Sequence, residues 1–240
     1  MPESTPSVMI PAQPALFQHP MTRLRQRLAG PGAIKIVALG SSTTAGEGGI
    51  VPYPHRLETF LRNHGNPTFK GRNFDVLNRG IGSQEAPQER DRMQQDVIDE
   101  HPTVVIWQVG TNSAFKNNPT PDVTAEAIRD GLTKLAKISA DIILMDPQYV
   151  PPLLPPDAMA RARTMVRLID EAAAGASVPV NVFKRFDFMQ QWHDAEKISF
   201  DRIVDPTDPE RLHHSDWSVI RLAWNLAEVM VKATVPGPMA

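Results

Sequence analysis

IVALGSSTTAGEGG (residues 36–49) runs from an apolar tract directly into a turn rich in glycines and hydroxyl side chains. The tract has the β-branched and apolar composition of a buried strand. Four consecutive hydroxyl residues, Ser41 to Thr44, then lie between Gly40 and Gly46. A strand that ends in such a turn and leads into a helix can present a phosphate-binding loop or a nucleophilic side chain.

Four more short runs rich in Val and Ile follow along the chain, and most of them stop at Gly or Pro. Together with the first run, they predict strands over residues 33–40, 74–80, 103–110, 141–147 and 178–183. Helical patterns separate the strands, at residues 54–64, 87–100, 120–138 and 157–174, and a last helix opens at Ser215. This alternation predicts an α/β protein, a three-layer α/β/α sandwich around a five-stranded, mostly parallel sheet.

The chain of 240 residues shows no internal repeat and no second composition regime, which predicts a single domain over residues 31–240. Residues 1–30 are rich in proline and are predicted to form an N-terminal arm, with a short helix at 21–30. They lack the basic and long apolar segments of a signal peptide. A signal removed before residue 1 would leave no trace, so the compartment stays open between cytoplasmic and periplasmic or secreted.

Composition excludes several classes of partner and chemistry. The net charge is −2, which gives no reason to expect nucleic acid or an anionic membrane as a partner. Cysteine is absent, which excludes disulfides, thiolate catalysis and cysteine-ligated zinc. No apolar run approaches the ~20 residues of a membrane span. Oligomeric state is left open.

Polar residues gather where the first four predicted strands end. Ser42, Ser83, Asn112 and Asp146 each follow one of these strands. Since the carboxyl ends of parallel strands share one edge of the sheet, and ligands bind at that edge in open α/β sheets, a site is expected there.

The first turn does not match the common nucleotide-binding patterns. A P-loop requires a lysine after its second glycine, and none follows Gly46. The dinucleotide pattern G-x-G-x-x-G is also missing. Two interpretations remain: a cluster of hydroxyl residues that only caps the next helix, and a nucleophile on a strand-to-helix turn whose backbone N–H groups face a developing oxyanion.

A nucleophilic serine needs a general base. Among seven histidines, His213 and His214 lie in DPERLHHSDWSVI (208–220), just before the last helix. Glu210 lies three residues ahead of His213, so a short turn could hold its carboxylate against the imidazole. A structural role for His213 remains an alternative. A metal site made of the two histidines and Asp216 is disfavoured, because adjacent histidines usually point apart.

Four segments resemble the sequence blocks of the SGNH, or GDSL-type, hydrolases: ALGSSTTAG (38–46), NRGIGSQ (78–84), VGTNS (109–113) and PERLHHSDW (209–217). The resemblance covers about residues 33 to 232 and implies a flavodoxin-like SGNH hydrolase fold. It also implies the roles of five residues. Ser42 would be the nucleophile, Ser83 a backbone donor and Asn112 a side-chain amide donor to the oxyanion. His213 would be the base, and Glu210 the carboxylate that orients it. It implies no metal and no organic cofactor. Glu210 stands where the family usually has Asp.

The resemblance implies a serine esterase that hydrolyses a small acyl ester, acetyl or short-chain, of a small molecule or a carbohydrate. An acyltransferase with the same residues and a non-catalytic binding module on the same fold are the alternatives. Asp208, or a backbone carbonyl in a Ser-His dyad, could orient His213 in place of Glu210.

Two loops are predicted to line the site. The turn GEGGIVPYP (46–54) follows the nucleophile, and the proline-rich segment 146–159 follows the fourth strand. For the second loop a rigid connector is the favoured interpretation of so many prolines, and the alternative is a substrate-lining wall with Tyr149 and Leu153 as contacts.

Overall fold

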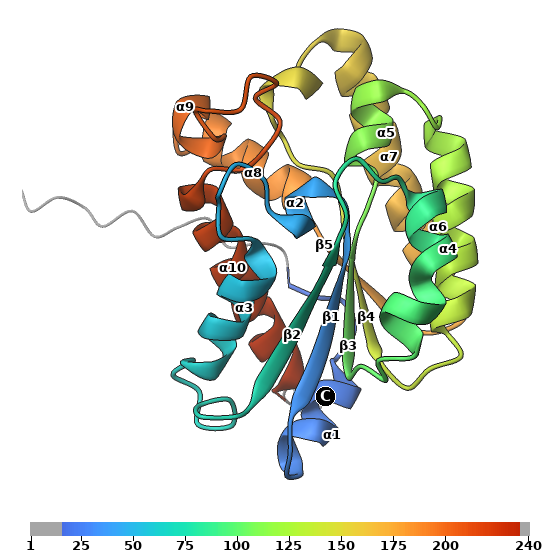
Figure 1. The fold of residues 1–240 in the computed structure, drawn as a ribbon, viewed down its shortest axis with the longest axis vertical. Helices are drawn as coiled ribbons and strands as arrows, with labels where there is room; N and C mark the ends of the chain where they lie inside the picture. Colours follow the sequence, from blue (N-terminus) through green and yellow to red (C-terminus); the bar gives the residue numbers. More distant parts are fainter. Residues whose placement is uncertain (1–15, 236–240) are drawn as a thin grey trace, which may run out of the picture.

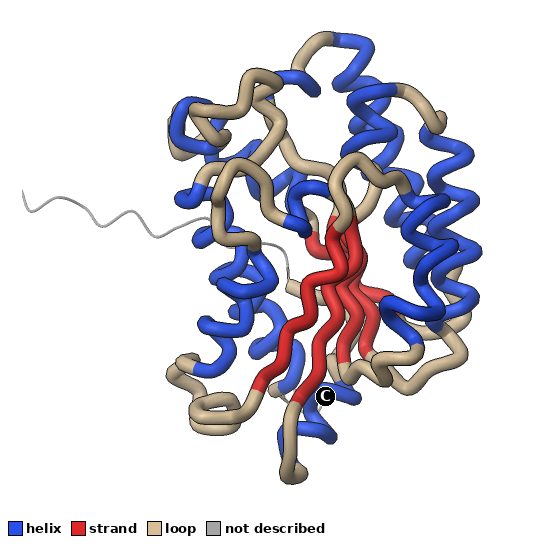
Figure 2. The backbone as a smooth tube through the Cα atoms, in the orientation of Figure 1, coloured by secondary structure: helices blue, strands red, loops and turns tan. Residues whose placement is uncertain are grey.

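The computed structural model describes residues 16–235 and contains the predicted five-stranded sheet (Figures 1 and 2). All strands run parallel, in the order β2-β1-β3-β4-β5, so the sheet is fully rather than mostly parallel. Their bounds lie close to the predicted ones: β1 (Ile34–Gly40), β2 (Phe74–Gly80), β3 (Val104–Gln108), β4 (Asp141–Met145) and β5 (Val180–Phe183). This strand order is the flavodoxin-like one.

Helices cover both faces of the sheet, as Figure 1 shows. One face carries α1 (Thr22–Ala29), α3 (Tyr53–Arg62) and α10 (Asp216–Thr234), and the other carries α4 (Ala86–Met93), α6 (Pro121–Leu135) and α7 (Pro156–Ala174). Ile106 packs into the first core and its neighbour Trp107 into the second. Because both faces are buried, the strands read as continuous apolar runs in the sequence.

The N-terminal segment packs onto the domain. The helix predicted at 21–30 is confirmed as α1, and Met21, Leu24 and Leu28 are buried in the core. The carboxylate of Asp141, at the start of β4, accepts hydrogen bonds from the backbone N–H groups of Arg23 (3.2 Å) and Leu24 (2.8 Å). The predicted boundary at residue 30 is therefore wrong for the described part of the arm; residues 1–15 lie outside the described residues.

The helices depart from prediction in several places, and a short helix that was not predicted, α5 (Thr111–Lys116), follows β3. The helix predicted over 87–100 is divided into α4 and a π-helical turn, η1 (Gln94–Ile98). Two helices that the sequence did not predict, α8 (Arg185–Asp194) and α9 (Phe200–Ile203), follow β5. With the 3₁₀ turn η2 (Pro151–Leu153), they enclose a third hydrophobic cluster near the carboxyl edge of the sheet. Between residues 16 and 235, no helix has the length and apolar composition needed to cross a membrane.

Candidate active site

The hydroxyl-rich turn after β1 is a single helical turn, α2 (Ser42–Ala45), tied to the end of the neighbouring strand β3. The side-chain oxygen of Gln108, which is buried, lies 3.2 Å from Ser41 Oγ, 3.1 Å from Thr43 Oγ1 and 3.2 Å from Thr44 Oγ1. Each hydroxyl can donate to this single amide oxygen. Three of the four hydroxyls therefore hold the turn in place, and Ser42 alone is directed to a histidine.

Two glycines allow the turn to pack closely against the sheet. A Cβ atom on Gly40 would lie 2.3 Å from Thr44 Oγ1, and one on Gly80, at the end of β2, would lie 2.1 Å from the backbone nitrogen of Ala45. Both separations are far inside van der Waals contact. The glycine that ends each strand is therefore a requirement of the nucleophile turn.

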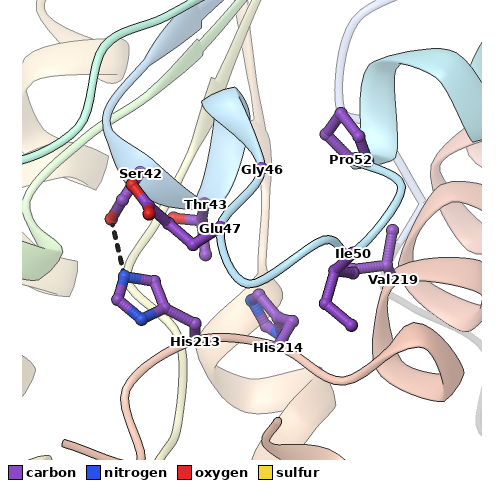
Figure 3. Close-up of a pocket in the computed structure, with 9 residues that line it drawn as sticks. All are labelled: Ser42, Thr43, Gly46, Glu47, Ile50, Pro52, His213, His214 and Val219. Atoms are coloured by element: carbon purple, nitrogen blue, oxygen red, sulfur yellow. Dashed lines mark hydrogen bonds between the residues drawn. The ribbon is translucent and has the colours of Figure 1, made fainter. Parts of the chain in front are cut away.

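The predicted pairing of Ser42 with His213 is present in the structure. Ser42 Oγ lies 3.0 Å from His213 Nε2, although the two residues are 171 positions apart in the sequence (Figure 3). The other ring nitrogen, Nδ1, lies 2.9 Å from Asp208 Oδ2. A carboxylate only accepts hydrogen bonds, so Nδ1 carries the hydrogen of the neutral ring and Nε2 is free to accept the proton of Ser42.

The predicted contact between Glu210 and His213 is wrong, because Asp208 takes that place. The Asp208 carboxylate accepts hydrogen bonds from the backbone N–H groups of Glu210 (3.0 Å), Leu212 (2.7 Å) and His213 (2.7 Å). Arg211 has a positive φ of 53°, which turns the chain back over the short aspartate. The Glu210 side chain is left exposed.

These bonds also set the protonation state of Asp208. Burial by itself would raise its pKa, but the backbone N–H groups of His213, Leu212 and Glu210 stabilise the carboxylate and bring the pKa below its ordinary value. A charged Asp208 beside Nδ1 is the arrangement that orients a catalytic imidazole.

The two predicted oxyanion donors lie on either side of the nucleophile turn. Ser83 follows β2 and Asn112 follows β3, and these strands flank β1. Asn112, buried in the first turn of α5 (Thr111–Lys116), donates an Nδ2 hydrogen to the carbonyl oxygen of Gln84 at 3.0 Å. An amide nitrogen carries two hydrogens, so one remains for another acceptor. Ser83 is exposed and has a φ of 64°, in the region that favours glycine.

A cleft beside the catalytic pair is lined by the turn that follows the nucleophile. Figure 3 shows Ser42, Thr43 and Glu47 on one side, Ile50, Pro52 and Val219 on the other, and the two histidines below. The expectation that turn 46–54 lines the site is confirmed. The other expected wall is absent, because Tyr149 and Leu153 are buried in the third hydrophobic cluster.

His214 differs sharply from its neighbour. It is buried, and neither of its ring nitrogens has a hydrogen-bond partner in the described part of the chain. Burial, followed by the charges of Arg185 and His213, brings its pKa well below the ordinary value. His214 is therefore neutral near pH 7 and has no contact with Ser42, which leaves His213 as the candidate base.

Comparisons with known proteins identify a family for the chain. A model of the non-GDSL lipase-like family matches residues 8–234. A relative described as an uncharacterized lipoprotein, from Bacillus subtilis, is 33% identical over 107 residues, which are 43% of this chain; the match spans only 42% of that relative's length.

Solved structures share the fold at low sequence identity. A lipolytic protein of the G-D-S-L family from Desulfitobacterium hafniense has a TM-score of 0.62 at 20% identity, over 81% of this chain and 98% of its own. A two-domain esterase active on acetylated mannans has a TM-score of 0.71 at 17% identity, over 92% and 56%. An acetylxylan esterase from Geobacillus stearothermophilus has a TM-score of 0.62 at 17% identity, over 84% and 94%. These likenesses confirm the predicted flavodoxin-like fold, and together with the family match they confirm the resemblance to SGNH hydrolases.

Proposed function

Since the chain belongs to the non-GDSL lipase-like family, we propose that it is a carboxylic ester hydrolase that works through Ser42, His213 and Asp208. The observation that carries this proposal is the unbroken series of contacts from Ser42 Oγ to His213 Nε2 and from His213 Nδ1 to Asp208. Glu210 has no part in it.

The chemistry follows from the roles of these side chains. His213 takes the proton of Ser42 as the serine oxygen attacks the ester carbonyl, and the positive imidazolium is stabilised by Asp208. The backbone N–H groups of Ser42 and Ser83, with the second amide hydrogen of Asn112, bind the oxyanion of the tetrahedral intermediate. His213 then protonates the leaving alcohol and activates water, which releases the acid and restores Ser42.

We propose a small acyl group, acetyl or short-chain, on a carbohydrate or another small alcohol. Ile50, Pro52 and Val219 give the cleft beside Ser42 an apolar wall, which suits a short apolar acyl group. Two of the proteins that share the fold act on acetylated polysaccharides: acetylated mannans for one, acetylxylan for the other. Both observations favour an acetyl ester.

The experiment combines turnover with covalent labelling. The protein is incubated with p-nitrophenyl acetate and butyrate, and separately with a fluorophosphonate, and mass spectrometry locates the adduct. We expect faster turnover of the acetate and an adduct on Ser42. Ser42→Ala should lose both signals. Ser41→Ala, which changes only a contact with Gln108, is the matched control and should keep most activity.

Two alternatives predict different results in the same experiment. An acyltransferase would form the adduct on Ser42 but deliver the acetyl group to an added acceptor sugar faster than to water. A binding module would neither hydrolyse the esters nor react with the fluorophosphonate. The contact between Asp208 and His213 argues against the binding module, because it supplies the carboxylate that Glu210 does not.

We also propose a location outside the cytoplasm, the periplasmic or secreted one of the two compartments that the sequence leaves open. The support is that the partial relative from Bacillus subtilis is described as a lipoprotein. Fractionation of the producing cells tests this: recovery of the protein in the cytoplasmic fraction alone would contradict it.

A further inference from the structure

Four polar side chains are buried together at the carboxyl edge of the sheet, behind the catalytic residues. Thr111 begins α5, Asp146 and Gln148 follow β4, and Arg185 begins α8. None of the four is more than 2% exposed. Burial of a polar side chain lowers the stability of the fold unless hydrogen bonds replace those it made with water.

Hydrogen bonds join the side chains of Arg185, Thr111 and Gln148 in a single direction, and Asp146 takes part through its backbone carbonyl. Arg185 can only donate, so its Nη2 donates to Thr111 Oγ1 at 3.2 Å. The Thr111 hydroxyl therefore gives its own hydrogen to Gln148 Oε1, 2.9 Å away. This identifies the oxygen end of the Gln148 amide, and Nε2 at the other end donates to the carbonyl oxygen of Leu212 at 3.0 Å. Arg185 is itself held by its Nε, which donates to the backbone carbonyl of Asp146 at 2.8 Å.

Two members of this series, Thr111 and Leu212, adjoin the two halves of the catalytic site. Thr111 immediately precedes Asn112, the amide donor to the oxyanion, and Leu212 immediately precedes His213, the base. Gln148 is the only side chain of the series that contacts both segments. A displacement of its amide would therefore change the distance between the oxyanion donor and the imidazole.

We propose that Gln148 is a positioning residue that sets the His213 loop relative to the Asn112 turn, with Thr111 and Arg185 orienting its amide. The proposal rests on the proposed function of Ser42 and His213. It adds a residue that lies behind the site and never touches the substrate.

The main test replaces Gln148 by methionine, which has a similar length but neither end of the amide. We expect kcat on p-nitrophenyl acetate to fall by about 10- to 100-fold with little change in KM, since small misplacements of catalytic groups have effects of this size. Thr111→Val, which removes the hydroxyl, should lower kcat as well. Thr111→Ser, which keeps the hydroxyl, should recover most of it.

A buried amide in the edge strand β5 provides the matched control. Asn181 in β5 accepts a hydrogen bond from the backbone N–H of His19 (2.9 Å) and donates to its carbonyl oxygen (3.0 Å). Asn181→Leu also removes two buried hydrogen bonds, so thermal stability should fall as in Gln148→Met. Its kcat should stay at the parent value, because it contacts no part of the site.

A second measurement is independent of turnover. The ¹⁵N chemical shifts of the His213 ring report which nitrogen carries the hydrogen, and the parent should show it on Nδ1. Asp208 keeps this hydrogen on Nδ1 in Gln148→Met, so we expect the change at Nε2: its signal should shift as the contact with Ser42 Oγ lengthens, whereas Asn181→Leu should match the parent. If Gln148→Met does not fold, Gln148→Glu replaces it, since a carboxylate still accepts from Thr111 but no longer donates to Leu212.

Parent kcat and a parent Nε2 signal in Gln148→Met would overturn the proposal. An equal loss of kcat in Asn181→Leu would also overturn it, since the effect would then be one of general stability. A parent protein that hydrolyses no ester would instead overturn the proposed function, while the Nε2 signal would still decide the role of Gln148.

Discussion

Strand β4 has a buried aspartate at each end, and the two are paired very differently. Asp141, at the amino end, binds backbone N–H groups of α1 with both of its oxygens. Asp146, just past the carboxyl end, accepts one bond from the backbone N–H of Phe186 (2.9 Å), and its second oxygen has no partner among residues 16–235. Burial raises the pKa of both, and that of Asp146 to about 7.

Buried amides show the same contrast. Asn181, in the edge strand β5, uses its oxygen and its nitrogen on His19, whereas Asn112, at the carboxyl edge, donates one hydrogen to Gln84. Asp141 and Asn181 are thus fully engaged in holding the N-terminal segment. Asp146 and Asn112, at the carboxyl edge, each keep an acceptor or a donor available, which is what binding and catalysis require.

The largest expected difference between the two edges concerns carboxylates. Asp208→Asn should lower kcat by about 10³- to 10⁴-fold, because an amide in this place favours the wrong tautomer of the imidazole. Asp141→Asn should lower the free energy of unfolding and leave kcat unchanged. Measurements of kcat/KM from pH 6 to 9, with denaturant unfolding of each variant, check both.

Glu210→Gln completes this prediction. Because Glu210 is exposed and makes no contact with the imidazole, kcat/KM of the variant should stay within about twofold of the parent value, as expected for an exposed charge. A greater loss in Glu210→Gln than in Asp208→Asn would contradict the orientation of His213 by Asp208.

The next effect concerns amides. Asn112→Ala should reduce kcat by about 10²- to 10³-fold with little change in KM, as expected for an oxyanion donor that acts in the transition state. Asn181→Ala should reduce thermal stability alone. Ser83→Gly should keep activity, because only the backbone N–H is needed and glycine adopts a φ of 64° without strain. A large loss in Ser83→Gly with an active Asn112→Ala would reverse the assignment.

A smaller effect is expected on the pH dependence of stability. The pKa of Asp146 is raised by burial to about 7, so its folded form keeps a proton that the unfolded chain releases near pH 4. The stability it contributes is complete below pH 4 and is lost as the pH rises through 7. Asp146→Asn removes this loss and still accepts from Phe186. The free energy of unfolding of Asp146→Asn minus that of the parent should therefore be about 1–2 kcal/mol larger at pH 8 than at pH 5.

The comparison with Asp141 and the other buried acids sharpens this result. Asp141→Asn should lower the free energy of unfolding at both pH values, because one oxygen that accepts a backbone N–H is lost. Burial raises the pKa of Glu85 to about 8 and that of Glu89 to about 7. These two acids should therefore keep part of the decrease of stability with rising pH in every variant. A parent protein whose stability rises from pH 5 to pH 8 would contradict the assignment of these protons.

The smallest expected effect is at the rim of the carboxyl edge. Glu47 is exposed and lines the cleft next to Ser42. Glu47→Gln should raise kcat/KM for an anionic ester about threefold relative to an uncharged ester of the same size, since one exposed charge contributes about 1 kcal/mol or less at this range. The difference should shrink in high salt. If the ratio of kcat/KM for the anionic ester to that for the uncharged ester is unchanged in low salt, substrates pass on the side of the cleft away from Glu47.

The sequence predicted the strands better than the helices around the site. Runs of β-branched residues that stop at Gly or Pro are seldom anything other than strands, and all five predicted strands are present. Helix α8 (RFDFMQQWHD) was missed because apolar and polar side chains alternate without a clean helical face, and its packing depends on residues from distant segments. α9 consists of a single turn, too short for a periodic pattern to show.

Within the site, the pairing of Ser42 with His213 could be predicted because each residue lies in a recognisable block. Counting residues back from His213 led to Glu210, but the turn geometry selects Asp208: Pro209 and the positive φ of Arg211 fold the aspartate under the imidazole. Gln108 and Gln148 leave no local pattern, since their partners are distant in the sequence.

Ser42 lies in the turn after β1 and His213 on the loop before the last helix, 171 residues later. A ribosome that adds about 5–20 residues per second needs roughly 10–35 s to travel from one to the other. During that interval a nascent chain can already build β1 and its turn, yet it holds a serine without a base. Hydrolysis therefore begins only when the end of the domain has been made and docked, and the onset of activity in a synchronised translation reaction measures the completion of folding.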